Sequence, residues 1–286
     1  MISQAELLAL RPPARDDGYY IVLTSAPVGD LAEASLAEAA ALLRLKVPEF
    51  SRILNVGQVV PLNRVPTSED AALIEAKLRP LGIETLILAH EDLHLDVTAK
   101  RIRALAVSDD ALTAIPTSGS DSVAARWDEV TQLVVGRLLL NRQEIEERKR
   151  HGRKQTVDSR HLSSDESVLD LYTSDQGNLR INANNFDFSC LGAVKGPTTF
   201  ENFASLISLL RECSAQAQFD DSYIQARPAL ASIWPLEQQT RKGDWRRSGA
   251  GKVDVATVTT TDNEAQFTRY SRLRHCLRLR ELVNTK

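Results

Sequence analysis

The stretch SEDAALIEAKLRPLGIETLIL, residues 68–88, decides the fold of the N-terminal third of the chain. Ser68 is expected to cap a helix, because its hydroxyl can accept a hydrogen bond from a free backbone N–H group of the first turn. Glu69 and Asp70 favour the same helix start, since acidic side chains are stabilised at the positive end of the helix dipole. The helix ends near Gly82, and the apolar run after it predicts a β-strand.

The residues before this stretch predict two strands and two helices. The strands are expected at residues 19–23 and 58–65, and the helices at residues 31–45 and 47–54. The first helix is rich in Ala and Leu, and Pro48 occupies a position that the first turn of the second helix tolerates. Residues 19–97 therefore predict a β-α-α-β-α-β sandwich domain.

This element order, with Ser68 before the last helix and Gly82 before the last strand, resembles the C-terminal domain of the bacterial ribosomal stalk protein. The resemblance implies a bacterial chain and a small recognition domain. In that family a lysine-rich pair of helices binds translation factors, whereas the matching helices here carry Glu33, Glu38 and Glu49. The resemblance therefore extends to the shape of the domain and not to the factor-binding surface.

Residues 98–220 contain short apolar or alternating runs separated by polar turn sequences, a pattern typical of antiparallel strands. A helix is predicted after them, because Phe203, Leu206 and Leu210 share one apolar face. Seven strands followed by one helix resemble a pleckstrin-homology-like barrel. The predicted fold class is therefore α+β.

The pleckstrin-homology resemblance also bears on the partner. Families with this fold bind inositol lipids through a basic loop after the first strand. The corresponding loop here is Ser108-Asp109-Asp110, which is acidic. The resemblance therefore implies a protein or peptide partner.

The predicted domains leave a leader at residues 1–18 and a basic arm with a terminal helix at residues 221–286. The net charge of −3 is unevenly spread, with −6 in residues 1–97, −2 in residues 98–220 and +5 in residues 221–286. A basic arm on an acidic body can meet a polyanion, or it can fold back on its own acidic half.

The sequence also bears on cellular location. It contains no apolar run of membrane-spanning length and no secretory signal sequence. Cys190, Cys213 and Cys276 have no paired spacing, which argues against a disulfide framework. A cytoplasmic location with no transmembrane segment is therefore expected.

The pentapeptide HEDLH, residues 90–94, matches the H-E-x-x-H pattern of zinc metalloproteases. In that pattern two histidines one helical turn apart hold the metal, and the glutamate acts on its bound water. Here the motif follows an apolar strand, and the residues after it alternate as strand residues do. On a strand His90 and His94 would stand about 13 Å apart, too far to share an ion. No metal or cofactor is expected, and a zinc hydrolase using His90, Glu91 and His94 is kept as an alternative.

Three further sequences hint at chemistry but lack an essential part of it. Residues 158–166, DSRHLSSDE, have no nucleophile elbow and are expected to form a polar loop. His275 and Cys276 are neighbours on a predicted helix, where they point about 100° apart. Residues 248–252, SGAGK, lack the first glycine and the final hydroxyl of a phosphate-binding loop. No catalytic residue is therefore predicted, and enzymatic activity is not expected.

Basic residues from two parts of the chain are the candidate binding residues. RKRHGRK at residues 148–154 is expected to form an exposed loop between two barrel strands, and the other basic residues lie in the C-terminal arm. The candidates are Arg148, Lys149, Arg150, Arg153, Lys154, Arg246, Arg247, Arg269, Arg272, Arg274 and Arg278. The terminal helix either docks on the body with an arginine rim or binds nucleic acid or an anionic membrane.

The sequence favours a non-enzymatic cytoplasmic protein that binds or scaffolds a protein or peptide partner, because two small recognition folds carry no assembled catalytic group. Binding of nucleic acid or an anionic surface through the basic residues is the first alternative, and it predicts affinity that falls steeply with salt. The zinc hydrolase is the second alternative. Whether the arm packs on its own chain or on a second copy, giving a homo-oligomer, stays open.

Overall fold

The computed structural model describes residues 17–25, 27, 29, 31–119, 121–150, 153–175, 177–242, 246–249 and 252–284. Of these, residues 147–150, 153–158, 246–249, 252–256 and 282–284 are described by their backbone only. Most of the expected leader, residues 1–16, lies outside the described part of the chain. None of the described helices has the length and hydropathy that a membrane span requires.

The N-terminal unit has the predicted β-α-α-β-α-β order. Its elements are β1 (Tyr19–Leu23), α2 (Glu33–Leu42), α3 (Val47–Val56), β2 (Val60–Val65), α4 (Ser68–Leu78) and β3 (Thr85–Ala89). The strands form an antiparallel sheet in the order β2-β1-β3. The cap of α4 is Thr67 and not Ser68, because the Thr67 hydroxyl accepts the N–H of Asp70 at 3.1 Å. Gly82 adopts a left-handed conformation after the helix, as its position predicts.

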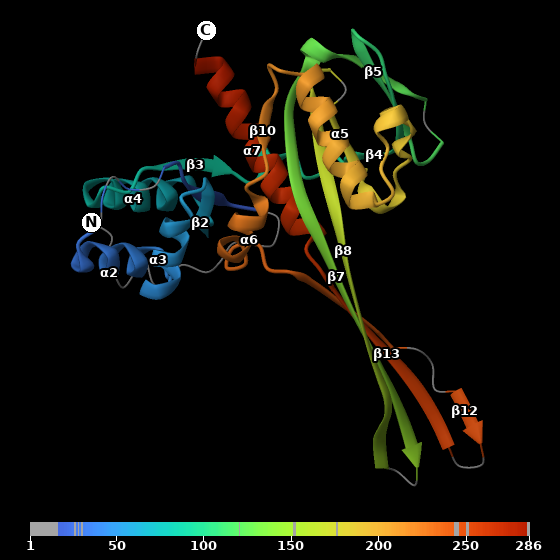
Figure 1. The fold of residues 1–286 in the computed structure, drawn as a ribbon. Helices are drawn as coiled ribbons and strands as arrows, with labels where there is room; N and C mark the ends of the chain where they lie inside the picture. The colour runs from blue at the N-terminus through green and yellow to red at the C-terminus, as the bar shows by residue number, and fades with distance from the viewer. Residues whose placement is uncertain are drawn as a thin grey trace.

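A larger curled sheet forms the second part of the molecule (Figure 1). Its main strands are β4 (Lys100–Val107), β5 (Ala111–Pro116), β6 (Val123–Arg126), β7 (Val130–Arg150), β8 (Arg153–Thr173), β9 (Gly177–Asn182), β11 (Glu237–Lys242) and β13 (Lys252–Asp262). They follow the order β11-β13-β7-β8-β9-β4-β5-β6. Two short strands, β10 (Gln218–Asp220) and β12 (Arg246–Gly249), pair with β7 and β13.

The predicted α+β class is confirmed, whereas the purely antiparallel sheet is wrong. β4 pairs with β9, and β10 with β7, in parallel. The sheet curls into a half-barrel against α5 (Thr199–Cys213). The capping box of α5 joins Thr198 and Glu201, and Phe203, Leu206 and Leu210 are buried on its apolar face as predicted.

Two helices from the expected C-terminal arm belong to the core. They are α6 (Tyr223–Leu230) and α7 (Glu264–Asn284). Phe267, Tyr270 and Leu273 of α7 are buried in one hydrophobic cluster with the N-terminal unit and with β7 and β8. The segment expected as an arm thus contributes α6, which the sequence did not predict, and α7, which is the predicted terminal helix; both pack in the cluster that joins the two sheets. The terminal helix docks through an amphipathic face, which was one of the two predicted alternatives.

Beyond this core, β7 and β8 continue as a long hairpin (Figure 1). We call residues 141–150, 153–167, 237–242, 246–249 and 252–262 the ribbon. The predicted loops at residues 148–154 and 158–166 are wrong within the described residues, because β7 and β8 are each 21 residues long and run through these sequences. β13 pairs with β7 from Leu140 to Arg150, so the ribbon is a sheet of at least three strands.

Candidate functional site

The HEDLH sequence is neither a strand nor an α-helix. β3 ends at Ala89, and a single 3-10 turn covers Glu91–Leu93. The strand prediction for this motif is therefore wrong. The Tyr20 hydroxyl lies 2.8 Å from Nδ1 of His90, whereas His94 has a left-handed φ of 46° and lines a cavity beside α7. Within the described part of the chain, no three His, Cys, Asp or Glu side chains are grouped to hold a metal ion.

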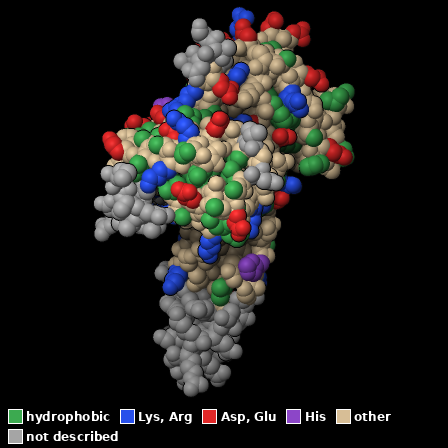
Figure 2. Space-filling model, turned by 90° about the vertical axis from the view of Figure 1, so that its left-hand side faces the viewer, with side chains coloured by type: hydrophobic (Ala, Val, Ile, Leu, Met, Phe, Trp, Pro, Cys, Tyr) green, Lys and Arg blue, Asp and Glu red, His purple; other side chains and the backbone are tan. Residues whose placement is uncertain are grey.

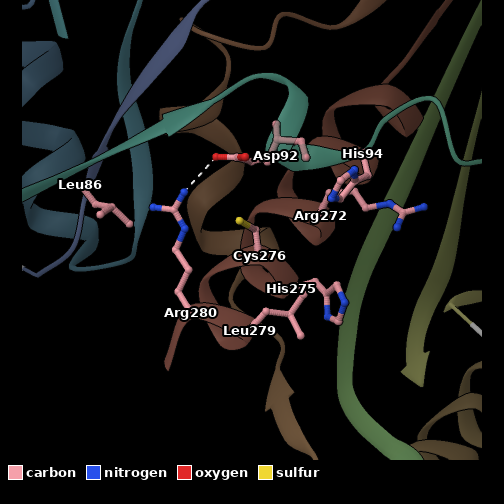
Figure 3. A pocket seen from close by; sticks show the side chains of 9 residues that line it. Leu86, Asp92, His94, Arg272, His275, Cys276, Leu279 and Arg280 are labelled. Carbon is pink, nitrogen blue, oxygen red and sulfur yellow. Dashed lines mark hydrogen bonds and ion pairs between the residues drawn. The ribbon is translucent and has the colours of Figure 1, made fainter. Parts of the chain in front are cut away.

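The cavity lies between the 3-10 turn and α7 and has a volume of about 500 Å³ (Figure 3). It is lined by Leu86, Asp92, Leu93, His94, Arg272, His275, Cys276, Leu279 and Arg280. Arg280 donates to Asp92 at 2.9 Å and to the carbonyl of Ile87 at 3.3 Å, and Arg272 donates to the carbonyl of Val97. These contacts bind α7 to the connection between the two sheets.

The other candidate arginines of α7 are also engaged within the molecule. Arg269 lies 4.0 Å from Glu237, Arg278 lies 3.5 Å from Glu281, and Arg274 pairs with the buried Asp220. Arg272 is only 8% exposed. The structure therefore does not gather the α7 arginines into an open basic surface.

His275 and Cys276 do not form a nucleophilic pair. The His275 ring stacks on Tyr172 with centroids 4.0 Å apart. Burial, together with the charges of Arg272 and His94, lowers the pKa of His275 to about 4. Burial raises the pKa of the Cys276 thiol. At neutral pH the two groups are a neutral imidazole and a protonated thiol, which suits packing better than catalysis.

A buried ion pair that the sequence did not indicate lies where α7 crosses the sheet. Arg180 donates to both carboxylate oxygens of Asp170, at 2.7 and 2.8 Å, and also to Glu264 and Thr268. Burial by itself would raise the pKa of Asp170, but the charge and hydrogen bonds of Arg180 hold it below its ordinary value. Every polar group of the Arg180 side chain thus has a partner within the fold, which indicates a structural role.

Ser159, His161, Ser163, Ser164 and Asp165 lie along the exposed part of β8. Asp165 pairs with Arg137 at 2.7 Å, and Ser163 donates to Asn141 at 2.8 Å. These are cross-strand contacts between β7 and β8. The described side chains of this segment form no Ser-His-Asp arrangement.

The ribbon brings together the basic residues that the sequence scatters. Three successive rows of paired residues cross its far end. In the first row Arg148 pairs with Gln155 and Asp254, and Asp254 pairs with Arg246. In the second row Lys149 pairs with Lys154 and Val253, and Val253 pairs with Arg247. In the third row Arg150 pairs with Arg153 and Lys252.

We call the basic residues of these rows the basic tip: Arg148, Lys149, Arg150, Arg153, Lys154, Arg246, Arg247 and Lys252. Seven of the eight are candidate binding residues predicted from the sequence, and the eighth, Lys252, is the last residue of SGAGK. No local signal marks Lys252, because only the pairing of β13 with β7 places it beside Arg150. Asp254 is the one acidic residue in the rows. The candidates therefore separate into a basic tip and a set of α7 arginines that are engaged with other parts of the molecule.

Comparisons with known proteins do not indicate a family or a function for this chain. No family model matches this chain, and neither the curated proteins nor the solved structures contain a match.

Proposed function

We propose that this protein is a non-enzymatic binding protein that holds nucleic acid through the basic tip of its ribbon. The observation that carries the proposal is the strand register, which collects eight Lys and Arg from three chain segments within three rows. A dense cationic cluster of this kind is the electrostatic footprint expected of a protein that neutralises phosphates.

The described side chains of the ribbon belong to neither hydrophobic core. Leu138 is the last core residue of β7, and the core resumes on β8 at Val168. After Trp234, the next core residue is Phe267. Among the described residues, the ribbon's strands therefore do not stabilise the fold by apolar burial, and a contact outside the molecule accounts for its length.

The negative charge of the body, as distinct from that of the acidic residues in the ribbon itself, does not oppose binding at the tip. The basic tip leaves 27 Lys and Arg against 38 Asp and Glu elsewhere, a net charge of −11. From Asn141 to Arg150 the ribbon extends about 30 Å at the usual rise of a strand. Electrostatic interactions are screened over about 8 Å at physiological ionic strength. On the face of the body that Figure 2 shows, acidic and basic side chains are also interspersed.

The test compares two variants with equal charge. In the tip variant Arg148, Lys149, Arg150, Arg153 and Lys154 are changed to Gln. In the control variant five exposed basic residues of the body, Arg52, Arg79, Lys100, Arg103 and Lys195, are changed to Gln. Both changes give a net charge of −8, so they differ only in where the charge is removed.

Binding is measured by fluorescence anisotropy with mixed-sequence duplex DNA, duplex RNA and single strands at 0.05–0.2 M salt. The tip variant is expected to lose about 100-fold in affinity and the control variant less than about threefold. Absence of binding by the unchanged protein to all of these nucleic acids would contradict the proposal. Equal losses in both variants would also contradict it.

A protein or peptide partner is the second candidate, and the edge of β8 favours it. β9 pairs with β8 only from Val168 onward, so residues 159–167 have a described strand on one side only. An extended peptide can add to such an edge. Leu162, which is 60% exposed, lies on this segment. Leu162→Lys should then reduce binding of a selected peptide and leave nucleic-acid binding unchanged.

We also propose the specific fold classes, the origin, the location and the oligomeric state that the sequence predicts. The strands of residues 98–220 with α5 support a pleckstrin-homology-like class, and the N-terminal element order supports a stalk-protein-like class. A bacterial origin, a cytoplasmic location and a homo-oligomer are likewise proposed. Sedimentation measurements over a range of concentrations test the oligomer directly.

A further inference from the structure

We infer that the basic tip enters the major groove of B-form duplex DNA end-on and contacts phosphates on both walls of the groove. This inference rests on the proposed function and names its partner. It follows from how the three rows distribute charge between the two faces of the ribbon, and from how far along the ribbon the charge extends.

Both faces of the tip carry cations. Successive rows of a β-sheet belong to opposite faces. The second row, with Lys149, Lys154 and Arg247, therefore belongs to one face. The first and third rows belong to the other face, which holds Arg148, Arg150, Arg153, Arg246 and Lys252. A flat anionic surface would engage one face, whereas a groove offers phosphates to both.

The cations are confined to a length that matches the depth of the groove. The first and third rows are two residues apart, about 7 Å along a strand, and the major groove of B-DNA is about 8.5 Å deep. The next rows toward the body are acidic: Glu147 pairs with Thr156, and Glu146 pairs with Asp158. Deeper insertion would bring these carboxylates against the phosphates, so the charge pattern sets the depth of entry.

The thickness of the ribbon selects the type of duplex. A single sheet with its side chains is about 10 Å thick, judged from the spacing of packed sheets. The major groove of B-DNA is about 12 Å wide, which exceeds the thickness of this sheet. The major groove of A-form RNA is deep and too narrow for side chains to read. Contacts to phosphates alone carry no sequence information, so the preference is for helix form and not for sequence.

The first experiment separates the two faces. One variant changes Lys149, Lys154 and Arg247 to Gln, and the matched variant changes Arg150, Arg153 and Lys252 to Gln. Each removes three charges from one face. Insertion into a groove predicts that both variants lose about tenfold or more in affinity for duplex DNA at 0.15 M salt. A loss in only one of them would overturn the inference, because it would show binding by one face.

The second experiment distinguishes the partners. The unchanged protein is titrated against a DNA duplex, an RNA duplex of the same sequence, and vesicles containing anionic lipid. A ligand that occupies the major groove should compete for the DNA duplex, and a minor-groove ligand should not. RNA duplex or vesicles binding as tightly as DNA would overturn the inference, as would competition by the minor-groove ligand alone. Absence of binding to every nucleic acid would instead remove the proposed function itself. Thermal unfolding of both face variants should match the unchanged protein, because the changes lie at the far end of the ribbon, away from the described core residues.

Discussion

Arg150 of β7 and Lys252 of β13 are register partners at the far end of the ribbon, although their positions in the sequence are 102 residues apart. Their pairing depends on α6 and α7 being anchored in the core on either side of the strands β11 and β13. The body thus positions a basic tip that no single segment of the sequence could form.

Removing the ribbon should leave the fold intact. Gln143 pairs with His161, and Thr240 pairs with Thr259. A two-residue Asn-Gly turn can close each of these pairs. A variant in which residues 144–160 and 241–258 are each replaced by Asn-Gly should unfold cooperatively within a few degrees of the unchanged protein and lose DNA binding. Thermal unfolding followed by circular dichroism checks this, and loss of the cooperative transition would show that the ribbon is part of the folding unit.

Gly136 should not tolerate a side chain. A Cβ atom there would overlap the buried ring of Phe267 and lie 3.1 Å from Tyr223. Overpacking of a dense core costs about 1–3 kcal/mol, so Gly136→Ala should lower the free energy of unfolding by about that amount. Chemical denaturation measures it. Combined with Phe267→Leu, the same change should cost less than it does alone, because the smaller side chain relieves the overlap. Strict additivity would contradict the packing account.

Arg180→Leu should destabilise the protein severely. It leaves the fully buried Asp170 without its charged partner, and breaking a buried pair costs about 3–5 kcal/mol. Arg101→Leu is the matched control, because Arg101 contacts the same Glu264 at 2.6 Å with a side chain that is 55% exposed. Arg101→Leu should lower the free energy of unfolding by less than about 1 kcal/mol. The Asp170→Leu/Arg180→Leu double variant should recover much of the loss, and equal effects of Arg180→Leu and Arg101→Leu would refute this assignment.

His275 should make the protein lose stability in mild acid. Its pKa is lowered from 6.5 to about 4 in the folded state. As pH falls from 6.5 toward 4, the unfolded chain binds this proton and the folded protein does not, so unfolding is favoured. His275→Gln removes the titration and keeps a side chain able to bond Gln132. The melting temperature of the unchanged protein should therefore fall relative to that of this variant as the pH is lowered from 7.5 to 4.5. A constant difference would contradict the assignment.

The sequence predicts the N-terminal unit well because its elements carry strong local signals. Apolar runs mark β1 and β3, and Gly82 ends the helical segment between Thr67 and β3. The helix α5 is marked equally clearly by its apolar face. These patterns depend on neighbours a few residues away.

The ribbon could not be predicted in the same way. Residues 143–166 are polar and charged without apolar alternation, so the strand state depends on pairing with β13 far along the chain. The rows of the basic tip are a consequence of that pairing. The α7 arginines could not be assigned from the sequence either. Their basic pattern does not indicate that Arg272 and Arg274 contact partners inside the molecule.

The central claim is that the basic tip binds the phosphates of nucleic acid, and the salt dependence of affinity tests it most directly. A plot of log affinity against log salt for duplex DNA should be linear, with a slope steeper than about −3 and no steeper than about −7, because eight cations release at most about 0.9 counterion each. The tip variant should have a much shallower slope. A slope near zero, or an equal slope in the tip variant, would contradict the account.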